Sequence, residues 1–213
     1  MIRSRYSRSL RLLFLILFLQ SALWAGVNTA NAGIFYEFGN QEQQHSADSF
    51  VVKQADQRVG LMLSLSSYSE SNDHFGVHYS LRAATTTHLK SDSIATKNLQ
   101  DFALDLAIGF ALQHPLSYRS FVEGGIGVRI AAISRSFDHN SDAMIEQVLS
   151  LGPAAFAHYS WAVHNNMVVQ VGAQVHLPIF GVGRLGKRGA PHEGKLTISG
   201  FEVAPYAGVA YVF

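Results

Sequence analysis

One short stretch that alternates without interruption constrains this chain more than any other feature. In FGVHYSLRA, residues 75–83, Phe75, Val77, Tyr79 and Leu81 share one parity, and glycine or polar residues fill the other. Successive side chains of a β-strand point to opposite faces, so this pattern predicts a strand with one apolar and one polar face. The polar face is either the outside of a soluble sheet or the inside of a membrane barrel.

Seven further segments of the chain alternate in the same way. Their apolar positions carry no charge, and no long stretch with the 3.6-residue period of a helix competes with them. The pattern therefore predicts an all-β chain. The eight segments lie at residues 33–39, 58–66, 75–83, 102–112, 122–130, 149–159, 167–177 and 201–213.

The connections between these segments alternate in length. Short ones read SSYSESND, QHPLSY and SWAVHNN, and long ones cover residues 40–57, 86–98, 134–146 and 179–195. Long loops on one rim and short turns on the other are typical of bacterial outer-membrane barrels with an even number of strands. A soluble periplasmic β-sandwich is the alternative fold.

Aromatic residues gather where the short turns are expected. We expect Tyr68, Tyr118, Trp161 and Phe213 to form an interfacial girdle at that rim. The chain also stops inside an apolar alternating segment, YAGVAYVF. Pro153 and Pro205 fall within predicted strands, where each removes a backbone donor. We therefore expect bulges or strand starts at these two prolines.

The N-terminal residues 1–32 have the features of a secretory signal peptide. A basic region with four arginines precedes the apolar run LLFLILFL, and ANA at residues 30–32 supplies small residues for cleavage. The apolar run is shorter than the roughly 20 residues of a membrane-spanning helix. We therefore expect an exported chain that is cleaved near Ala32, with residues 33–213 forming the folded domain.

Together these features resemble the small outer-membrane β-barrel family, which includes OmpA-type transmembrane domains, OmpX and the opacity proteins. The resemblance implies an eight-stranded antiparallel up-and-down transmembrane β-barrel in the bacterial outer membrane. In that family the barrel-assembly machinery reads the terminal aromatic strand. The resemblance thus implies that Tyr211 and Phe213 serve assembly rather than chemistry.

The polar face of the predicted strands carries both positive and negative side chains. A barrel of eight strands is just wide enough for side chains to fill it, and buried charges must be paired. We expect an ion-paired plug that closes the lumen, and a narrow path for small solutes is the alternative. The residues expected there are Arg58, Arg82, Asp101, Asp105, Glu123, Arg129 and Glu202, which Glu37 could extend.

The last long connection is basic. Arg184, Lys187, Arg188 and Lys195 predict a flexible outer loop that could meet lipopolysaccharide phosphates or an acidic partner. A merely solvated loop is an equal alternative. The letters of residues 181–188 also match part of a phosphate-binding loop, but Arg188 stands where Ser or Thr should hold Mg²⁺, so we expect no nucleotide site.

Two chemical interpretations of the polar residues are weak. His74 and His78 share a face but lie about 13 Å apart along an extended strand, too far for one metal ion. His158 and Ser160 resemble the His-x-Ser of lipid A 3-O-deacylase, but Trp161 replaces the Asn that follows in that family. Without cysteine there are no disulfides and no thiolate ligands. We expect no metal, no cofactor and no enzymatic activity.

The sequence thus predicts a monomeric, non-enzymatic surface barrel that supports the envelope or presents loops for adhesion or other interaction. Its expected partners are outer-membrane lipid and lipopolysaccharide, the barrel-assembly machinery, and a host or envelope protein that binds the loops. A net charge of +1 gives no reason to expect nucleic acid. A narrow channel and a lipid A-modifying enzyme remain the alternatives.

Overall fold

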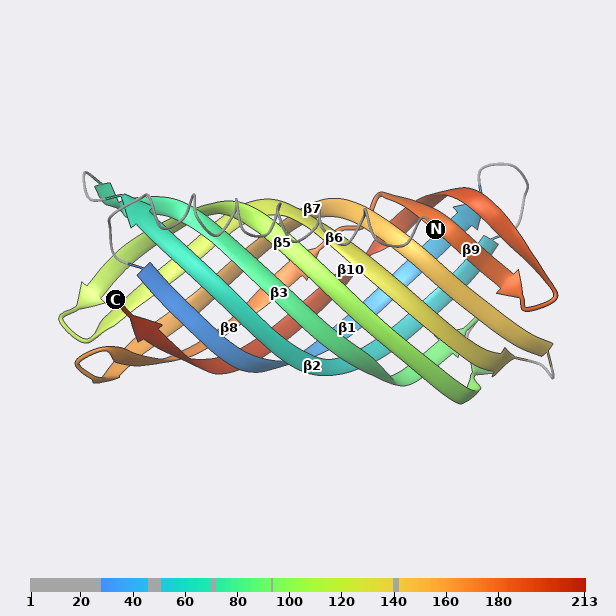
Figure 1. Cartoon of the computed structure of the whole chain (residues 1–213), viewed down its shortest axis with the longest axis horizontal. Coiled ribbons are helices and arrows are strands. Elements are labelled where there is room, and N and C mark those ends of the chain that lie inside the picture. The colour runs from blue at the N-terminus through green and yellow to red at the C-terminus, as the bar shows by residue number, and fades with distance from the viewer. Residues whose placement is uncertain (1–27, 46–50, 70–71, 93, 140–141) are drawn as a thin grey trace, which may run out of the picture.

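A closed ring of long antiparallel strands makes up the protein (Figure 1). The computed structural model describes residues 28–45, 51–69, 72–92, 94–139 and 142–213. Residues 1–27 of the expected signal peptide lie outside these ranges. The strands are β1 (Asn28–His45), β2 (Val51–Ser69), β3 (Asn72–Ser91), β4 (Ile94–Ala95), β5 (Lys97–Ser117), β6 (Ser120–His139), β7 (Asp142–His164), β8 (Met167–His176), β9 (Phe180–Lys187) and β10 (Ala190–Val212).

The wall of the barrel has eight positions in the described part of the chain. Neighbouring strands pair in chain order, and β1 closes the ring by pairing with both β2 and β10. The two-residue β4 pairs only with β3, while β8 and β9 follow one another between β7 and β10. The predicted eight-stranded antiparallel barrel is therefore confirmed. Among the described residues we find no helix long and apolar enough to cross a membrane.

The two ends of the barrel differ. Asn28, Phe213 and the tight turns at residues 118–119 and 165–166 lie at one end, which we call the turn end. The β9–β10 hairpin lies at the opposite end, the loop end, on the right in Figure 1. Trp161 and Phe213 are exposed at the turn end as expected, and Tyr118 is 89% exposed. The expectation for Tyr68 is wrong, because Tyr68 shares the parity of the lumen-facing Arg58 and Met62, and its fully buried ring lies over Gly76.

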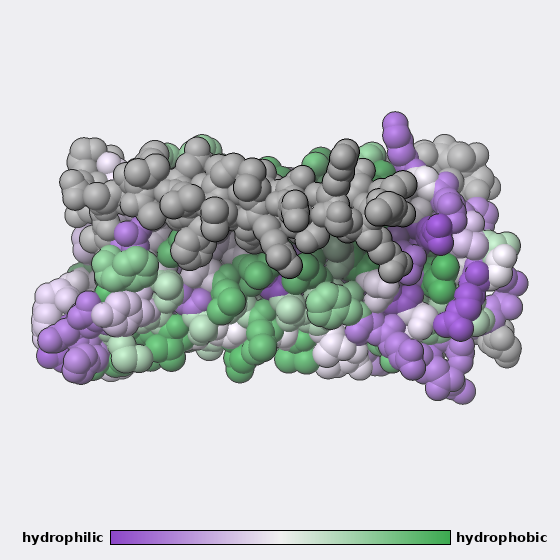
Figure 2. Space-filling view, viewed as in Figure 1, coloured by the Kyte–Doolittle hydropathy of each residue, from purple (hydrophilic) through white to green (hydrophobic). Residues whose placement is uncertain are grey.

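The apolar face of the alternating strands points outward. Large apolar side chains are exposed around the middle of the wall, and Figure 2 shows them as a green band between more polar ends. Since only lipid tolerates such a band, the polar face of the opening stretch is the inner one. We call this band the apolar belt; it includes Ile34, Leu61, Leu63, Phe110, Leu112, Ile126, Val171 and Val209.

The strands continue far beyond the apolar belt at the loop end. The expected long loops are wrong in most of their described parts: residues 40–45, 51–57, 86–91, 94–95, 97–98, 134–139, 142–146, 180–187 and 190–195 belong to strands. β7 alone has 23 residues, whereas about 9–11 cross a bilayer. Alternation persists there, but most outward residues are polar, so only a few apolar side chains such as Val51 and Val182 mark the outward face. This outer extension exposes Asn40, Gln44, Lys53, Thr87, Lys90, Gln100, Gln147 and Thr197.

Side chains fill the barrel along its length. Near the loop end, two small apolar clusters occupy the interior of the outer extension: Leu89, Phe137 and Met144 form one, and Val148, Leu196 and Ile198 form the other. The members of a third cluster are Phe35, Met62, Ala84, Ala103, Ile133, Ala204 and Tyr206. The interior is thus packed rather than open.

The two prolines interrupt individual ladders without ending their strands. Pro205 lies within β10, and the β1–β10 pairing skips the residues opposite Ala204 and Pro205. Pro153 lies within β7 opposite the break between β8 and β9, where the backbone amide of Leu177 donates to its carbonyl over 3.0 Å. Each proline removes one backbone donor, so pairing lapses locally while the neighbouring residues hold the strand.

Candidate functional site

Six charged side chains meet in the middle of the lumen. Arg58 contacts Glu37 at 3.1 Å and Glu202 at 2.5 Å, measured between nitrogen and oxygen. Arg129 contacts Asp105 and Glu202, each at 2.6 Å. Arg82 contacts Asp105 at 2.8 Å and also pairs with Glu37. We call Glu37, Arg58, Arg82, Asp105, Arg129 and Glu202 the central ion cluster.

The register of the sheet explains how these residues meet. Glu37 lies opposite Arg58 across the β1–β2 pair, and Arg82 lies opposite Asp105 across the β3–β5 pair. Arg129 then joins the two pairs across the lumen, because it reaches Glu37 at 3.1 Å as well as Asp105. All six residues are at most 2% exposed. Each charge therefore has partners of opposite sign, as burial requires.

A second polar layer lies closer to the loop end. Asp56 bridges Arg58 at 3.2 Å and Arg135 at 2.6 Å, and Arg135 also contacts Glu146 at 3.4 Å. The amides of Gln43 and Gln54 donate to Glu146 over 2.9 and 3.0 Å. Sequence reasoning missed this layer, because these residues fell in segments that we expected to be loops. Their persistent two-residue alternation was the available signal.

Glu123 lies apart from the central ion cluster, toward the turn end. Its carboxylate accepts a hydrogen bond from the Ser66 hydroxyl over 2.6 Å. It lies 3.4 Å from Nδ1 of His78 and 3.4 Å from Nε2 of His158. We call Ser66, His78, Glu123 and His158 the turn-end cluster. The expected plug is thus divided into separate groups, and Glu123 has histidines rather than arginines as its neighbours.

Asp101 does not join the lumen charges. It lies half-buried in the wall, where it accepts from the backbone amide of Thr86 over 2.9 Å and from the hydroxyl of Thr85 over 2.9 Å. Regular β3–β5 backbone pairing ends at Ala84 and Ala103. Just beyond that point, the Asp101 carboxylate accepts the hydrogen bond that the Thr86 amide would otherwise give to a backbone carbonyl. The Asp101 side chain therefore links β5 to β3 within the wall and does not plug the lumen.

The basic residues expected in a flexible loop lie on an ordered hairpin. Arg184 and Lys187 belong to β9, Lys195 belongs to β10, and Arg188 begins the turn between them. Arg184 contacts Glu193 at 3.0 Å, and Lys187 contacts Asp142 at 2.8 Å. Exposed ion pairs of this kind stabilise little, but they leave the cationic side chains at the surface.

The residues considered for enzymatic chemistry do not form a reactive arrangement. Ser160 and His158 both point into the lumen from β7, yet His158 contacts Tyr206, Gln170 and Glu123 rather than Ser160. Residues 181–187 of the phosphate-loop match lie mainly in extended β9, so the helix that such a loop needs does not follow it. Within the described ranges, no group of three or more His, Asp or Glu residues is arranged to hold a metal ion.

Comparisons with known proteins identify the fold. No protein-family model and no curated protein matches the chain. Among solved structures, the outer membrane protein OprG from Pseudomonas aeruginosa matches with a TM-score of 0.63 and 13% identity, covering 89% of this chain and 96% of that one. The outer membrane protease OmpT from Escherichia coli matches with a TM-score of 0.49 and 9% identity, over 88% and 97% of the two chains. Ail of Yersinia pestis matches with 0.43 and 11%, over 87% and 99%. The match to OprG shows that the chain has the fold of the small outer-membrane β-barrels.

Proposed function

We propose that this outer-membrane-type barrel is a non-enzymatic envelope protein with a closed lumen, and that its outer extension contacts partners at the cell surface. The observation that carries the proposal is the central ion cluster, in which three arginines and three carboxylates from six strands interlock across the lumen. We place the protein in the bacterial outer membrane, as a monomer.

The packing on either side of the cluster supports a closed lumen. The layer of Asp56, Arg135 and Glu146 lies on the loop-end side, and the apolar clusters of the outer extension lie beyond it. Moving one buried charge away would leave its partners without an opposite charge. In other proteins, breaking a buried ion pair in this way costs roughly 3–5 kcal/mol. Ions therefore meet a stable obstruction rather than a water-filled path.

The surface of the outer extension supports a role in interaction. It lies beyond the apolar belt and carries exposed Lys53, Lys90 and Lys195 on paired strands. Such cations suit phosphate groups of lipopolysaccharide or an acidic host or envelope protein. At the other end, Tyr211 and Phe213 are exposed and stack with ring centroids 6.2 Å apart, which suits the proposed recognition by the assembly machinery.

Single-channel recording in a planar lipid bilayer tests the closed lumen. We expect refolded protein to give no discrete current steps, with folding verified by a heat-dependent gel shift. Reproducible steps whose size changes in Asp105→Asn, but not in the surface variant Glu193→Gln, would instead establish a narrow channel. An altered lipid A mass in cells that make the protein, abolished by His158→Ala, would establish a lipid-modifying enzyme.

A further inference from the structure

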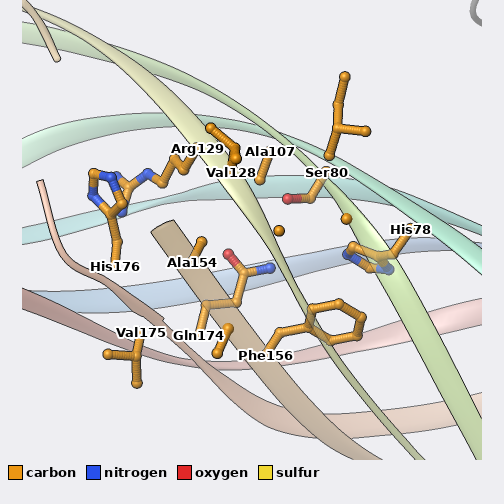
Figure 3. A pocket seen from close by; sticks show the side chains of 14 residues that line it. His78, Ser80, Ala107, Val128, Arg129, Ala154, Phe156, Gln174, Val175 and His176 are labelled. Atoms are coloured by element: carbon orange, nitrogen blue, oxygen red, sulfur yellow. The ribbon is translucent and has the colours of Figure 1, made fainter. Parts of the chain in front are cut away.

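An open groove lies on the outer face of the wall, along β1 and β10. It has a volume of about 190 Å³, and its outward-facing lining residues are Asn40, Glu42, Lys53, Ser199 and Phe201. By contrast, a cavity inside the lumen near Ser80, Phe156 and Gln174 measures about 20 Å³, roughly the room for one water molecule (Figure 3). A ligand larger than water therefore finds room in the outer groove and not in that cavity.

The register of the sheet brings the lining residues together from three strands. Glu42 pairs with both Ser199 and Lys53, so these three residues form one outward row across β10, β1 and β2. Asn40 pairs with Phe201 in the adjacent outward row, closer to the turn end. The groove thus has a charged side, formed by Glu42 and Lys53, and a side with an aromatic ring.

The space between the two rows stays open because neither residue there fills it. Gln41 pairs with Gly200 at this level, and the Gln41 amide turns into the lumen, where it donates to Glu202 over 2.5 Å. Gly200 has a φ of +143°, which residues with a side chain rarely adopt. A Cβ there would also collide with the carbonyl oxygen of Asn40. The groove is therefore built into the backbone of β1 and β10.

The groove lies at the border of the apolar belt. Phe38 on β1 and Phe201 on β10 are 45% and 49% exposed, so apolar side chains face lipid up to this level. The next outward residues toward the loop end, Asn40 on β1 and Ser199 on β10, are polar and exposed. Lipid headgroups lie where the apolar band of a barrel gives way to polar residues. The groove therefore opens into the headgroup layer at the loop end.

The chemistry of the lining favours a neutral, hydroxyl-rich ligand. Glu42 and Lys53 lie 3.5 Å apart, with side chains 45% and 69% exposed, so their charges cancel while both stay accessible. The Asn40 amide and the Ser199 hydroxyl can each donate and accept. An ionised phosphate would meet the Glu42 carboxylate, whereas sugar hydroxyls can donate to it and accept from Lys53. The ring of Phe201 suits the C–H face of a sugar.

We propose that this groove binds a sugar unit of lipopolysaccharide. The inference rests on the proposed function, which places the protein in the outer membrane, and it names the part of this lipid that is recognised. The sugar lies between the two rows, with its hydroxyls bonded to Asn40, Glu42, Lys53 and Ser199. The acyl chains of the same molecule then lie along the apolar belt, on the side of Phe201.

Two substitutions at the ion pair distinguish a sugar from a phosphate. NMR signals of Ser199 and Phe201, recorded in phospholipid nanodiscs with a rising fraction of lipopolysaccharide, give the fraction at half-saturation. We expect Glu42→Gln and Lys53→Gln each to raise that fraction about threefold, because each replaces a charged hydrogen bond with a neutral one. A bound phosphate would give opposite signs, since Glu42→Gln removes a repulsive charge and Lys53→Gln removes an attractive one. Opposite signs would overturn the proposal.

Removing one exposed amide tests the groove itself. We expect Asn40→Ala to raise the half-saturation fraction about fivefold, and Gln100→Ala, which removes an exposed amide of the outer extension outside the groove, to leave it unchanged. Lipopolysaccharide stripped of its phosphates should bind the unaltered protein nearly as well as the intact lipid. Loss of binding on removal of the phosphates would overturn the proposal.

The same titration separates a failure of the groove from a failure of the proposed function. A heat-dependent gel shift verifies that each variant is folded. If lipopolysaccharide shifts signals of the outer extension equally in the unaltered protein and in Asn40→Ala, Glu42→Gln and Lys53→Gln, the groove is rejected while the proposed contact with this lipid stands. If no signal of the outer extension responds to lipopolysaccharide, both are rejected.

Discussion

At the scale of single residues, the difference between buried and exposed ion pairs dominates. Arg129 contacts Glu37, Asp105 and Glu202, and its side chain is 3% exposed. Lys187 contacts Asp142, but the two side chains are 66% and 47% exposed. Water screens the second pair and not the first. The two positions therefore differ in their effect on stability, although both side chains are cationic and both belong to strands of the same wall.

Arg129→Met should lower the free energy of unfolding by about 3 kcal/mol, because three carboxylates lose a shared partner in a dry interior. Lys187→Met, the matched control, should change it by less than about 1 kcal/mol. Urea unfolding of the barrel in lipid vesicles measures both values. Equal effects of the two substitutions would contradict the arrangement of the central ion cluster.

At the scale of elements, the first residues of β1 constrain where the signal peptide can be cleaved. Residues 28–32 pair with β2 and β10, and Thr29 and Asn31 are buried in the lumen. The backbone of Asn28 also exchanges two hydrogen bonds with Phe213, at 3.0 and 2.9 Å. Cleavage near Ala32, where we expected it, would cut within β1 and leave the terminal strand partly unpaired.

We therefore predict that the mature chain begins no later than Asn28, rather than at Gly33. Each backbone N–H or C=O group left unpaired in hydrocarbon costs several kcal/mol. Folding therefore favours a chain that keeps residues 28–32. Intact-mass measurement of the protein extracted from membranes identifies the first residue. A folded, heat-modifiable barrel that starts at Gly33 would show that β1 does not need its first five residues.

At the scale of the whole molecule, a lipid-facing belt is followed by a water-facing wall. Val171 lies in the apolar belt and is 50% exposed. Thr197 is exposed on the outer extension, on the same side of the sheet but beyond the belt. The two surfaces belong to the same continuous strands. They differ in which outward side chains they carry, and therefore in whether lipid or water surrounds them.

Val171→Arg should destabilise the barrel in lipid vesicles by about 2–4 kcal/mol, because it places a charge near the middle of the belt. Thr197→Arg should cost less than about 1 kcal/mol, since that side chain meets water or lipid headgroups. Folding titrations in vesicles compare the two variants. A large penalty for Thr197→Arg would mean that the bilayer covers the outer extension.

Features that depend on neighbouring residues could be predicted from the sequence, and features that depend on distant ones could not. Alternation is visible within a few residues, so the strands around Phe75–Ala83 and the lumen-facing parity of Arg58, Arg82 and Asp105 could be predicted. The outer extension was missed because most of its outward residues are polar and contrast little with the polar residues of the inner face. The inward position of Tyr68 could also have been predicted, because Tyr68 shares the parity of the lumen-facing Arg58 and Met62.

The sequence by itself determined that the chain alternates, which residues share a face, and that one face is too apolar for water. Those properties depend only on neighbouring residues and on the period of a strand. The tertiary structure decided which charges meet, because contacts across the lumen depend on register summed around the whole ring. Arg129 meets Glu202, 73 residues away, whereas Asp101 remains in the wall.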